Sequence, residues 1–243
     1  MKAGSTKAVG FIYSLIEKGV VVDLTMKGSD LVGSKVGGIV VNVLQNCKVM
    51  GCVNYSDITG TKGAGGIVYD VETGGFVAGC TNYGDITGGA FNVGGICGYA
   101  WFPQAIIGCA NYGTVTGPQS ANGIVGYIYL KESRIKACFN AGEVVATGDT
   151  RTGYAISHTG FDWCYCTNGS TEYSGTLQYL NDRVHYIDGE NYTFAEAVED
   201  MNAAIEQYNA TATVKCNYRY VLNTDPETSE AYPLILQEVT DAQ

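Results

Sequence analysis

Basic residues are scarce in this sequence, which holds 14 Lys and Arg against 24 Asp and Glu and carries a formal net charge of −10. Binding to the phosphate backbone of nucleic acid needs a basic face, so this balance argues against a nucleic-acid partner. Long apolar runs are also missing, since the longest candidate, residues 36–44, is interrupted and too short for a membrane span. We therefore expect no nucleic-acid partner and no membrane insertion of this segment.

Histidine is rare as well, with two residues in the chain, and no HExxH zinc-peptidase motif occurs. The first ten residues lack the apolar core of a secretory signal. Disorder is not expected, because 46% of the residues are apolar and only 16% are charged. The 33 glycines are instead suited to many tight turns.

The chain is dominated by a repeat, of which the stretch CTNYGDITG from Cys80 is the clearest copy. Related stretches begin at Cys52, Cys109, Cys138 and Cys166, so the spacing is nearly constant along the chain. Half a period away, VGGIV at 36–40 recurs as AGGIV at 64–68 and VGGIC at 93–97. A period this regular predicts a solenoid in which each repeat forms one coil.

Each coil is expected to hold three short strands, because short runs rich in β-branched side chains are bounded by glycine. The array extends from about Gly10 to Ser170, close to six coils. Stacking aligns apolar residues in inward columns, such as Val21, Val49, Val77, Ile106 and Ile135. The prediction is an all-β fold, a parallel β-helix of about six coils of about 28–29 residues each.

Two further columns are interpreted as structural. The cysteine column is predicted to contain Leu24, Cys52, Cys80, Cys109, Cys138 and Cys166, and the asparagine column Asn54, Asn82, Asn111, Asn140 and Asn168. The spacing of coils permits disulfides, but parallel side chains point the same way and five cysteines cannot all pair, so we favour reduced, packed thiols. Asparagine tolerates the left-handed conformation of a corner and can satisfy backbone groups of the next coil.

The repeat stops near Tyr173, which divides the chain into a β-solenoid at 1–172 and a small α+β unit at 173–243. Thr193 and Glu196 form a capping box that predicts a helix at about 194–208, and a hairpin is expected at about 214–236. A solenoid needs its open end covered, so we expect this unit to cap the last coil. The first nine residues are too few and too polar for the same task, and we expect further chain upstream in the natural protein.

GGIVY followed by the pattern G-x-x-x-C-x-N-x-G-x-I-x-G resembles the GLUG-motif repeats of bacterial surface proteins. Such repeats occur in adhesin-like proteins of gut bacteria and beside IgA-peptidase domains. The resemblance covers most of the chain. It implies a right-handed β-solenoid on an exported, surface-attached protein, located at the cell surface or outside the cell, and it implies no catalytic residues.

Two groupings bear on catalysis. Arg134-Ile-Lys136 resembles the R-x-K step of polygalacturonase-like enzymes, but the aspartate cluster and Gly-His-Gly that would accompany it are missing from neighbouring coils. His158, Asp162 and Cys164 can be drawn as a thiol dyad with an orienting carboxylate, yet nothing in their spacing supports it. We therefore expect no catalytic site, no metal site and no cofactor.

One set of repeated residues is predicted to point outwards and to form a ligand-binding face. It contains Tyr55, Tyr83 and Tyr112, then Asp57 and Asp85 with Glu143, then Thr59, Thr87 and Thr116. Tyrosine rings stack on sugars or on partner side chains. The carboxylates either hold calcium or are merely solvated, and the threonines reflect strand propensity or a regular hydroxyl face such as ice binders use.

These observations lead to the hypothesis of a non-enzymatic module of a bacterial cell-surface protein, with an adhesive or spacer role and a host glycan or surface protein as partner. The alternative is a carbohydrate-binding or polysaccharide-degrading β-helix protein.

Overall fold

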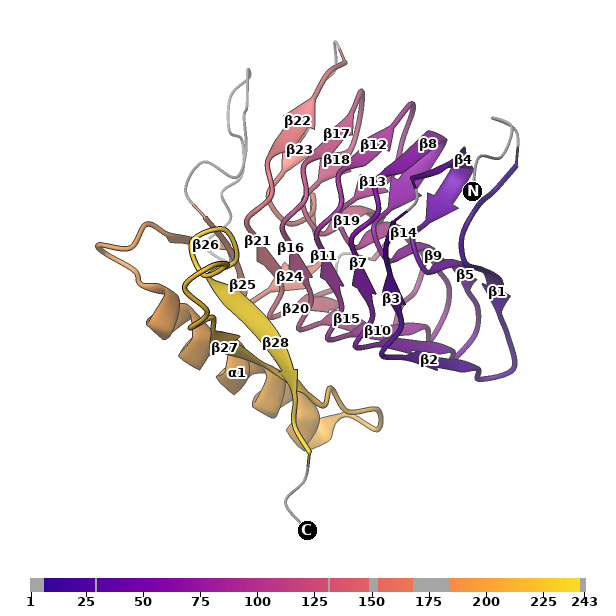
Figure 1. Ribbon diagram of the computed structural model, residues 1–243. Helices are drawn as coiled ribbons and strands as arrows, with labels where there is room; N and C mark the ends of the chain where they lie inside the picture. The colour runs from indigo at the N-terminus through magenta and orange to yellow at the C-terminus, as the bar shows by residue number, and fades with distance from the viewer. Residues whose placement is uncertain (1–6, 29, 131, 149–152, 168–183, 241–243) are drawn as a thin grey trace.

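The computed structural model describes residues 7–28, 30–130, 132–148, 153–167 and 184–240. Parallel strands stack into a β-solenoid about five turns long, followed by one helix and a small antiparallel sheet (Figure 1). The predicted β-solenoid fold is confirmed, with about five full turns where the spacing predicted six.

Each coil passes through four sheets, which we number in the order in which the chain first enters them. Sheet 1 contains β1 (Ile12–Leu15), β5 (Val40–Val43), β9 (Val68–Val71), β14 (Cys97–Ala100) and β19 (Val125–Ile128). Sheet 2 contains β2 (Val20–Val22), β6 (Lys48–Met50), β10 (Phe76–Ala78), β15 (Ala105–Ile107), β20 (Ile135–Lys136) and β24 (Phe161–Asp162).

The other two sheets hold the corners and the glycine-rich segments. Sheet 3 contains β3 (Thr25–Met26), β7 (Val53–Asn54), β11 (Thr81–Asn82), β16 (Ala110–Asn111), β21 (Phe139–Asn140), β25 (Cys164–Thr167) and β26 (Val184–Ile187). Sheet 4 contains β4 (Leu31–Gly37), β8 (Ile58–Gly65), β12 (Ile86–Gly88), β13 (Val93–Gly94), β17 (Val115–Gly117), β18 (Ala121–Asn122), β22 (Val144–Ala146) and β23 (Gly153–Tyr154). The expected corner at Asn82 is thus itself part of a short strand, so a coil has more strands than the three predicted.

The core is built from columns of equivalent side chains one coil apart. The register of sheet 2 aligns Val21, Val49, Val77, Ile106 and Ile135. All of these except Val21, which lies at the exposed first coil, are fully buried. Each such side chain stabilises the fold by about 1.5–3 kcal/mol, which explains why strands too short to be stable alone form a stack.

A left-handed residue precedes the cysteine position in every coil, and it sets the register of the cysteine column. The positive φ angles fall at Asp23, Gly51, Gly79, Gly108, Ala137 and Trp163. The residue after Trp163 is Cys164, so Cys164 occupies the sixth position of the column and Cys166 does not. The pairing of Cys166 with Asn140 agrees with this assignment.

This register corrects two predicted columns. Cys166 takes the position predicted for an asparagine, next to Asn140, and Met26 takes that position on the first coil. Asn168 lies outside the described residues.

The shift arises in the connection from sheet 1 to sheet 2 of the last coil. Ile156 occupies the position of Ile124, since it accepts the backbone N–H of Ile124 and of the residue after it, and Phe161 pairs with Ile135. The connection from Ile156 to Phe161 is therefore much shorter than the one from Ile124 to Ile135. The cysteine position is reached earlier in the chain than a constant period predicts.

All nine cysteines are free and buried. The thiols of the column donate to backbone carbonyls, as Cys80 Sγ does to Ala78 O at 3.3 Å and Cys138 Sγ to Lys136 O at 3.3 Å. Burial raises the pKa of the Cys80 and Cys138 thiols well above the ordinary value. Cys80 and Cys138 are therefore protonated, and the buried thiols of the column pack as small apolar groups.

The asparagines form a continuous buried hydrogen-bonded ladder. Asn54 Nδ2 donates to Asn82 Oδ1, Asn82 Nδ2 to Asn111 Oδ1 and Asn111 Nδ2 to Asn140 Oδ1, each at 2.8 Å. Each amide also donates to the backbone carbonyl two residues further on, for example from Asn82 to Gly84 O at 2.8 Å. The ladder therefore closes each corner and ties successive coils together.

The C-terminal unit contains α1 (Phe194–Thr211), β27 (Tyr218–Leu222) and β28 (Leu234–Glu238), the two strands pairing antiparallel. The predicted capping box is present, with the backbone N–H of Glu196 donating to Thr193 Oγ1 and that of Thr193 to the Glu196 carboxylate. The first strand of the hairpin begins later than the predicted span 214–236, and the second ends later.

This unit lies along the side of the solenoid rather than over its end, which corrects the expected position of the cap (Figure 1). Tyr220 donates to Cys109 O at 2.8 Å and Tyr165 to Asp200 Oδ2 at 3.3 Å, so the contacts reach several coils. The physical reason is the outer face of sheets 2 and 3, which carries apolar side chains such as Phe76 that need cover.

Candidate functional site

The predicted tyrosine stripe exists as a stack of rings on adjacent coils. The rings of Tyr55 and Tyr83 are 4.7 Å apart at an interplanar angle of 10°, and those of Tyr83 and Tyr112 are 5.3 Å apart at 9°. Tyr55 is 45% exposed, whereas Tyr83 and Tyr112 are half-buried. Tyr83 stands between Tyr55 and Tyr112, so both of its faces are covered by neighbouring rings.

The C-terminal unit covers part of the tyrosine stripe. Tyr232 of the C-terminal unit packs edge-on against Tyr83 at 4.7 Å and Tyr112 at 5.1 Å. The Tyr112 hydroxyl donates to Leu234 O. Burial raises the pKa of Tyr83 to about 12. The tyrosine stripe therefore serves mainly as a packing surface for the C-terminal unit.

The carboxylates of the predicted column accept hydrogen bonds from the backbone of the next coil. Asp57 Oδ1 accepts the backbone N–H of Asp85 at 2.9 Å, and Asp85 Oδ1 accepts that of Thr114 at 2.8 Å. These bonds link one coil to the next. Beside them, Thr59 and Thr87 are exposed and Thr116 is half-buried.

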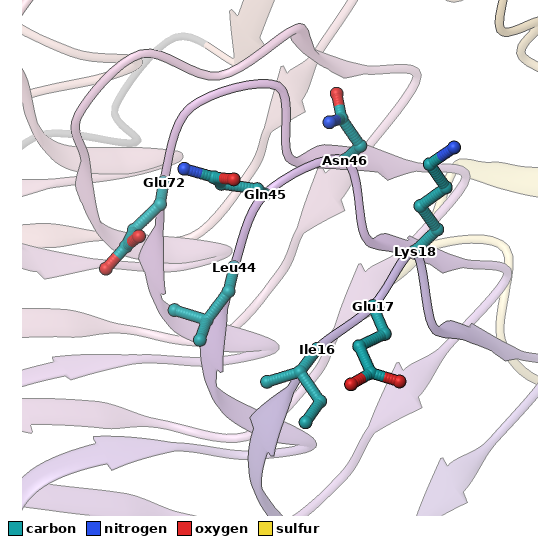
Figure 2. A pocket seen from close by; sticks show the side chains of 7 residues that line it. All are labelled: Ile16, Glu17, Lys18, Leu44, Gln45, Asn46 and Glu72. Atoms are coloured by element: carbon teal, nitrogen blue, oxygen red, sulfur yellow. The ribbon is translucent and has the colours of Figure 1, made fainter.

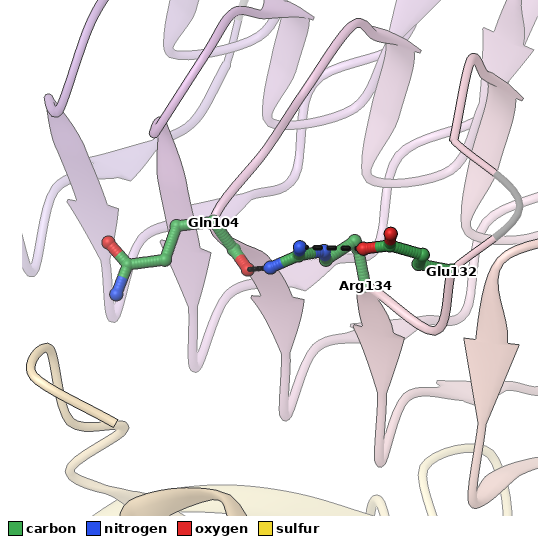
Figure 3. Close-up of polar contacts among 3 residues, drawn as sticks. All are labelled: Gln104, Glu132 and Arg134. Carbon is green, nitrogen blue, oxygen red and sulfur yellow. Dashed lines mark hydrogen bonds and ion pairs between the residues drawn. The ribbon is translucent and has the colours of Figure 1, made fainter. Parts of the chain in front are cut away.

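The basic pair on sheet 2 makes ordinary surface contacts. Figure 3 shows Arg134 between Glu132, whose Oε2 lies 2.8 Å from its Nη2, and Gln104, whose backbone oxygen accepts from Nη1 at 3.4 Å. Lys136 Nζ lies 3.8 Å from Asp162 Oδ2. The two basic side chains are thus engaged with neighbours of the same face.

His158, Asp162 and Cys164 have separate surroundings. The His158 ring stacks on Tyr127 at 4.9 Å, and burial lowers its pKa. Asp162 is directed toward Lys136, and the Cys164 thiol is buried in the core, where it donates to Asp162 O at 3.4 Å. The fold does not assemble these side chains into a nucleophile and base.

An aromatic surface that the sequence argument missed lies on the outer side of sheet 1. We call Tyr99, Trp101, Tyr127 and Tyr129 the aromatic face. Register pairs Tyr99 with Tyr127, and the bond from Tyr129 N to Ala100 O places Tyr129 beside Trp101. Two columns of two rings result.

The rings of the aromatic face stack along the solenoid axis. Tyr99 and Tyr127 are 5.6 Å apart at 9°, and Trp101 and Tyr129 are 4.5 Å apart at 24°. The two columns are joined by the 6.1 Å contact of Tyr99 with Trp101. Trp101 is 41% exposed and Tyr129 52%, so this surface is open to a ligand.

A sequence signal for the aromatic face is present. Tyr99 and Tyr127 lie one repeat period apart, and so do Trp101 and Tyr129, inside the glycine-rich half of the repeat. The spacing assigns that half to strand and turn, and it does not by itself show which alternate residues point outwards.

Two carboxyl groups border the aromatic face on the preceding coil. Register places Asp70 beside Tyr99, and the bond from Trp101 N to Val71 O places Glu72 beside Trp101. Burial, and then the nearby Glu72 charge, raise the pKa of Asp70 to about 6, while Lys35 opposes the shift. Asp70 Oδ1 is buried with no hydrogen-bond partner among the described residues.

A hollow of about 470 Å³ continues from Glu72 toward the first coil (Figure 2). Ile16 and Leu44 form its apolar part, and Glu17, Lys18, Gln45 and Asn46 its polar part. Leu44 N donates to Leu15 O and Glu72 N to Val43 O, which puts Ile16, Leu44 and Glu72 in the column that ends in Trp101 and Tyr129. One continuous strip thus runs across five coils.

Within the described ranges, no three His, Cys, Asp or Glu side chains converge as metal ligands. No helix in the part of the chain that the structure describes has the length and apolar character needed to cross a membrane. Comparisons with family models, with curated proteins and with solved structures found no match to this chain.

Proposed function

We propose that this chain is a non-enzymatic β-solenoid module of a bacterial cell-surface protein, and that its aromatic face binds a glycan. The observation that carries the proposal is the set of two parallel ring columns on sheet 1, with Trp101 and Tyr129 exposed beside each other. Aromatic surfaces of this kind bury the apolar faces of sugar rings, and nearby polar groups fix their orientation.

The adhesive role, the surface location and the membership in the GLUG-motif family belong to this proposal. They are supported by the recurrence of the cysteine, asparagine and glycine columns in a rigid stack. Such a stack holds a binding surface in fixed geometry, since each coil contacts only its neighbours along one axis. The net charge of −10 limits self-association of an exposed module.

Binding is tested on a glycan array, followed by titration of the strongest ligands. Trp101→Ala is expected to reduce affinity at least about fivefold, since stacking of a planar ligand on an aromatic side chain contributes about 1–3 kcal/mol. Trp163→Ala is the matched control, because Trp163 is also 41% exposed but lies elsewhere, against His185. Equal losses in both variants would contradict the assignment of the aromatic face.

A polysaccharide-degrading activity is the competing function, because Asp70 and Glu72 provide two carboxyl groups beside the aromatic rings. Incubation with the bound glycan and analysis of the products separates the two functions. Shortened products that disappear in Glu72→Gln would overturn the non-enzymatic proposal. Absence of binding to every glycan tested would contradict the adhesive role and leave a spacer role.

A further inference from the structure

The coil that precedes the aromatic face is the most acidic part of the strip. Asp70 and Glu72 lie two residues apart at the end of β9, one in the column of Tyr99 and the other in the column of Trp101. Carboxyl groups and aromatic rings therefore occupy successive coils rather than being mixed at random over the surface.

One side of each ring column lies toward these carboxyls. Tyr99 stacks on Tyr127 with one face, so its other face is on the side of Asp70. Trp101 likewise stacks on Tyr129, and its other face is on the side of Glu72. A ring face next to a carboxylate favours a cationic group, which is attracted by both.

One oxygen of the Asp70 carboxyl lacks a hydrogen-bond partner among the described residues. This oxygen, Oδ1, is buried. Lys35 is the basic group that acts on it electrostatically, yet Lys35 Nζ lies over the Tyr69 ring, 5.4 Å from its centre, and the pair forms no ion pair within the described residues. Because the Asp70 side chain as a whole is only partly buried, a cationic group of a ligand can approach the carboxyl from solvent and stabilise its ionised form.

The shape of the strip selects an extended ligand. The distance from the first to the fifth coil is about 19 Å, at about 4.8 Å per coil. Along that length a chain meets the aromatic rings, then the two carboxyl groups and then the hollow lined by Leu44 and Ile16 (Figure 2). The negative net charge of the protein favours approach of a cationic polymer as well.

We propose that Asp70 and Glu72 bind the free amino group of a glycan, so that the strip recognises a polymer of glucosamine units rather than its N-acetylated form. This inference rests on the proposed glycan-binding function of the aromatic face. The rings of Tyr99 and Trp101 take the sugar faces, and the carboxyl groups accept N–H bonds from an ammonium group. N-acetylation removes the positive charge and replaces it with a neutral amide, which leaves both carboxylates without a cation.

The test compares a glucosamine hexamer with the N-acetylglucosamine hexamer of the same linkage, near neutral pH and at two salt concentrations. Trp163→Phe leaves Trp101 as the single tryptophan, so its fluorescence reports contact with the aromatic face. The amino form is expected to bind at least about tenfold more tightly, and added salt should reduce that preference.

Asp70→Asn and Glu72→Gln are each expected to remove most of the preference while binding of the acetylated hexamer is retained. Glu230→Gln is the control, since it removes the same charge from an exposed carboxyl on the C-terminal unit. Cooperative unfolding of each variant verifies that it is folded.

The failures of the two proposals can be distinguished. Equal affinity for both hexamers, with loss of both in Trp101→Ala, would overturn the amino-group inference and leave glycan binding intact. A preference for the amino form that persists in Asp70→Asn and Glu72→Gln would also overturn it. No binding of either hexamer, together with an empty glycan array, would overturn both.

Discussion

The Tyr218 hydroxyl donates to the Asp23 carboxylate at 3.0 Å, across 195 positions of the sequence. This bond fixes the C-terminal unit to the first coil, and the Tyr218 ring lies over the left-handed glycines of the next coils. Burial raises the pKa of Tyr218, and the adjacent Asp23 charge acts in the same direction. The left-handed residues that precede the cysteine column thus form the corner of each coil, and those of the first coils also contact the C-terminal unit.

Gly79→Ala is expected to displace the C-terminal unit. A Cβ atom at Gly79 would lie 2.1 Å from the Tyr218 ring, and the φ of 64° adds backbone strain. We expect a loss of about 2–4 kcal/mol in the free energy of unfolding, measured in urea, together with faster proteolysis of the C-terminal unit.

Gly28→Ala separates the clash from the strain, because Gly28 has a φ of 92° and nothing within 4 Å of the added Cβ. Its cost should be about 1 kcal/mol, with no change in proteolysis of the C-terminal unit. Similar losses of stability in the two variants would show that the packing of Tyr218 against Gly79 contributes little to the free energy of unfolding.

The repeat is readable in the sequence because strand pairing imposes one period on every column, so periodicity alone predicts the solenoid and its inward ladders. The position of the C-terminal unit is not readable in this way. Whether it covers the end or the side depends on which outer side chains are apolar, and periodicity identifies Phe76 and Ile107 only as strand residues. The shift from Cys166 to Cys164 has a similar cause, since a shortened connection changes the register without changing the motif.

Thiol titration tests the cysteine column. In urea without reductant we expect nine reactive thiols, because all nine cysteines are free. In the native protein the reaction should be slow, since every thiol is buried and burial raises the pKa of Cys80 and Cys138. Fewer than nine thiols in the unfolded protein would show that neighbouring coils are joined by disulfides.

Asn82→Ala is expected to be one of the most damaging small substitutions in the solenoid. It removes the hydrogen bonds to Asn54, Gly84 and Asn111. The side-chain oxygen Oδ1 of Asn111 then loses the donor that Asn82 supplies, in a fully buried site. The loss should be about 3 kcal/mol, measured by urea unfolding. Thr87→Ala, at an exposed position of the same coil, should change the stability by less than about 0.5 kcal/mol, and a comparable loss there would mean that the ladder has no special role.

The tyrosine stripe and the aromatic face differ in exposure, and the sequence does not predict this difference. Both recur at the repeat period, but the repeat pattern predicts an outward direction for Tyr83 and does not identify Trp101. Only the path of the C-terminal unit distinguishes them, because Tyr232 covers Tyr83 while Trp101 stays open. A tertiary contact between distant segments has no local signature.

The stability of the protein is expected to depend on pH through Asp70, and one substitution of this residue tests that dependence. Its pKa is raised from 3.8 to about 6, so the folded protein holds a proton that the unfolded chain releases between these values. Stability from this residue is therefore greatest at low pH and falls as the pH rises from about 4 to 6. Partial exposure of the side chain leaves a cost of about 1 kcal/mol once it is ionised. Asp70→Asn should match the native protein near pH 4 and exceed its stability by that amount at pH 7, in urea titrations at each pH. A difference that stays constant between pH 4 and pH 7 would show that the Asp70 carboxyl ionises as it does in the unfolded chain.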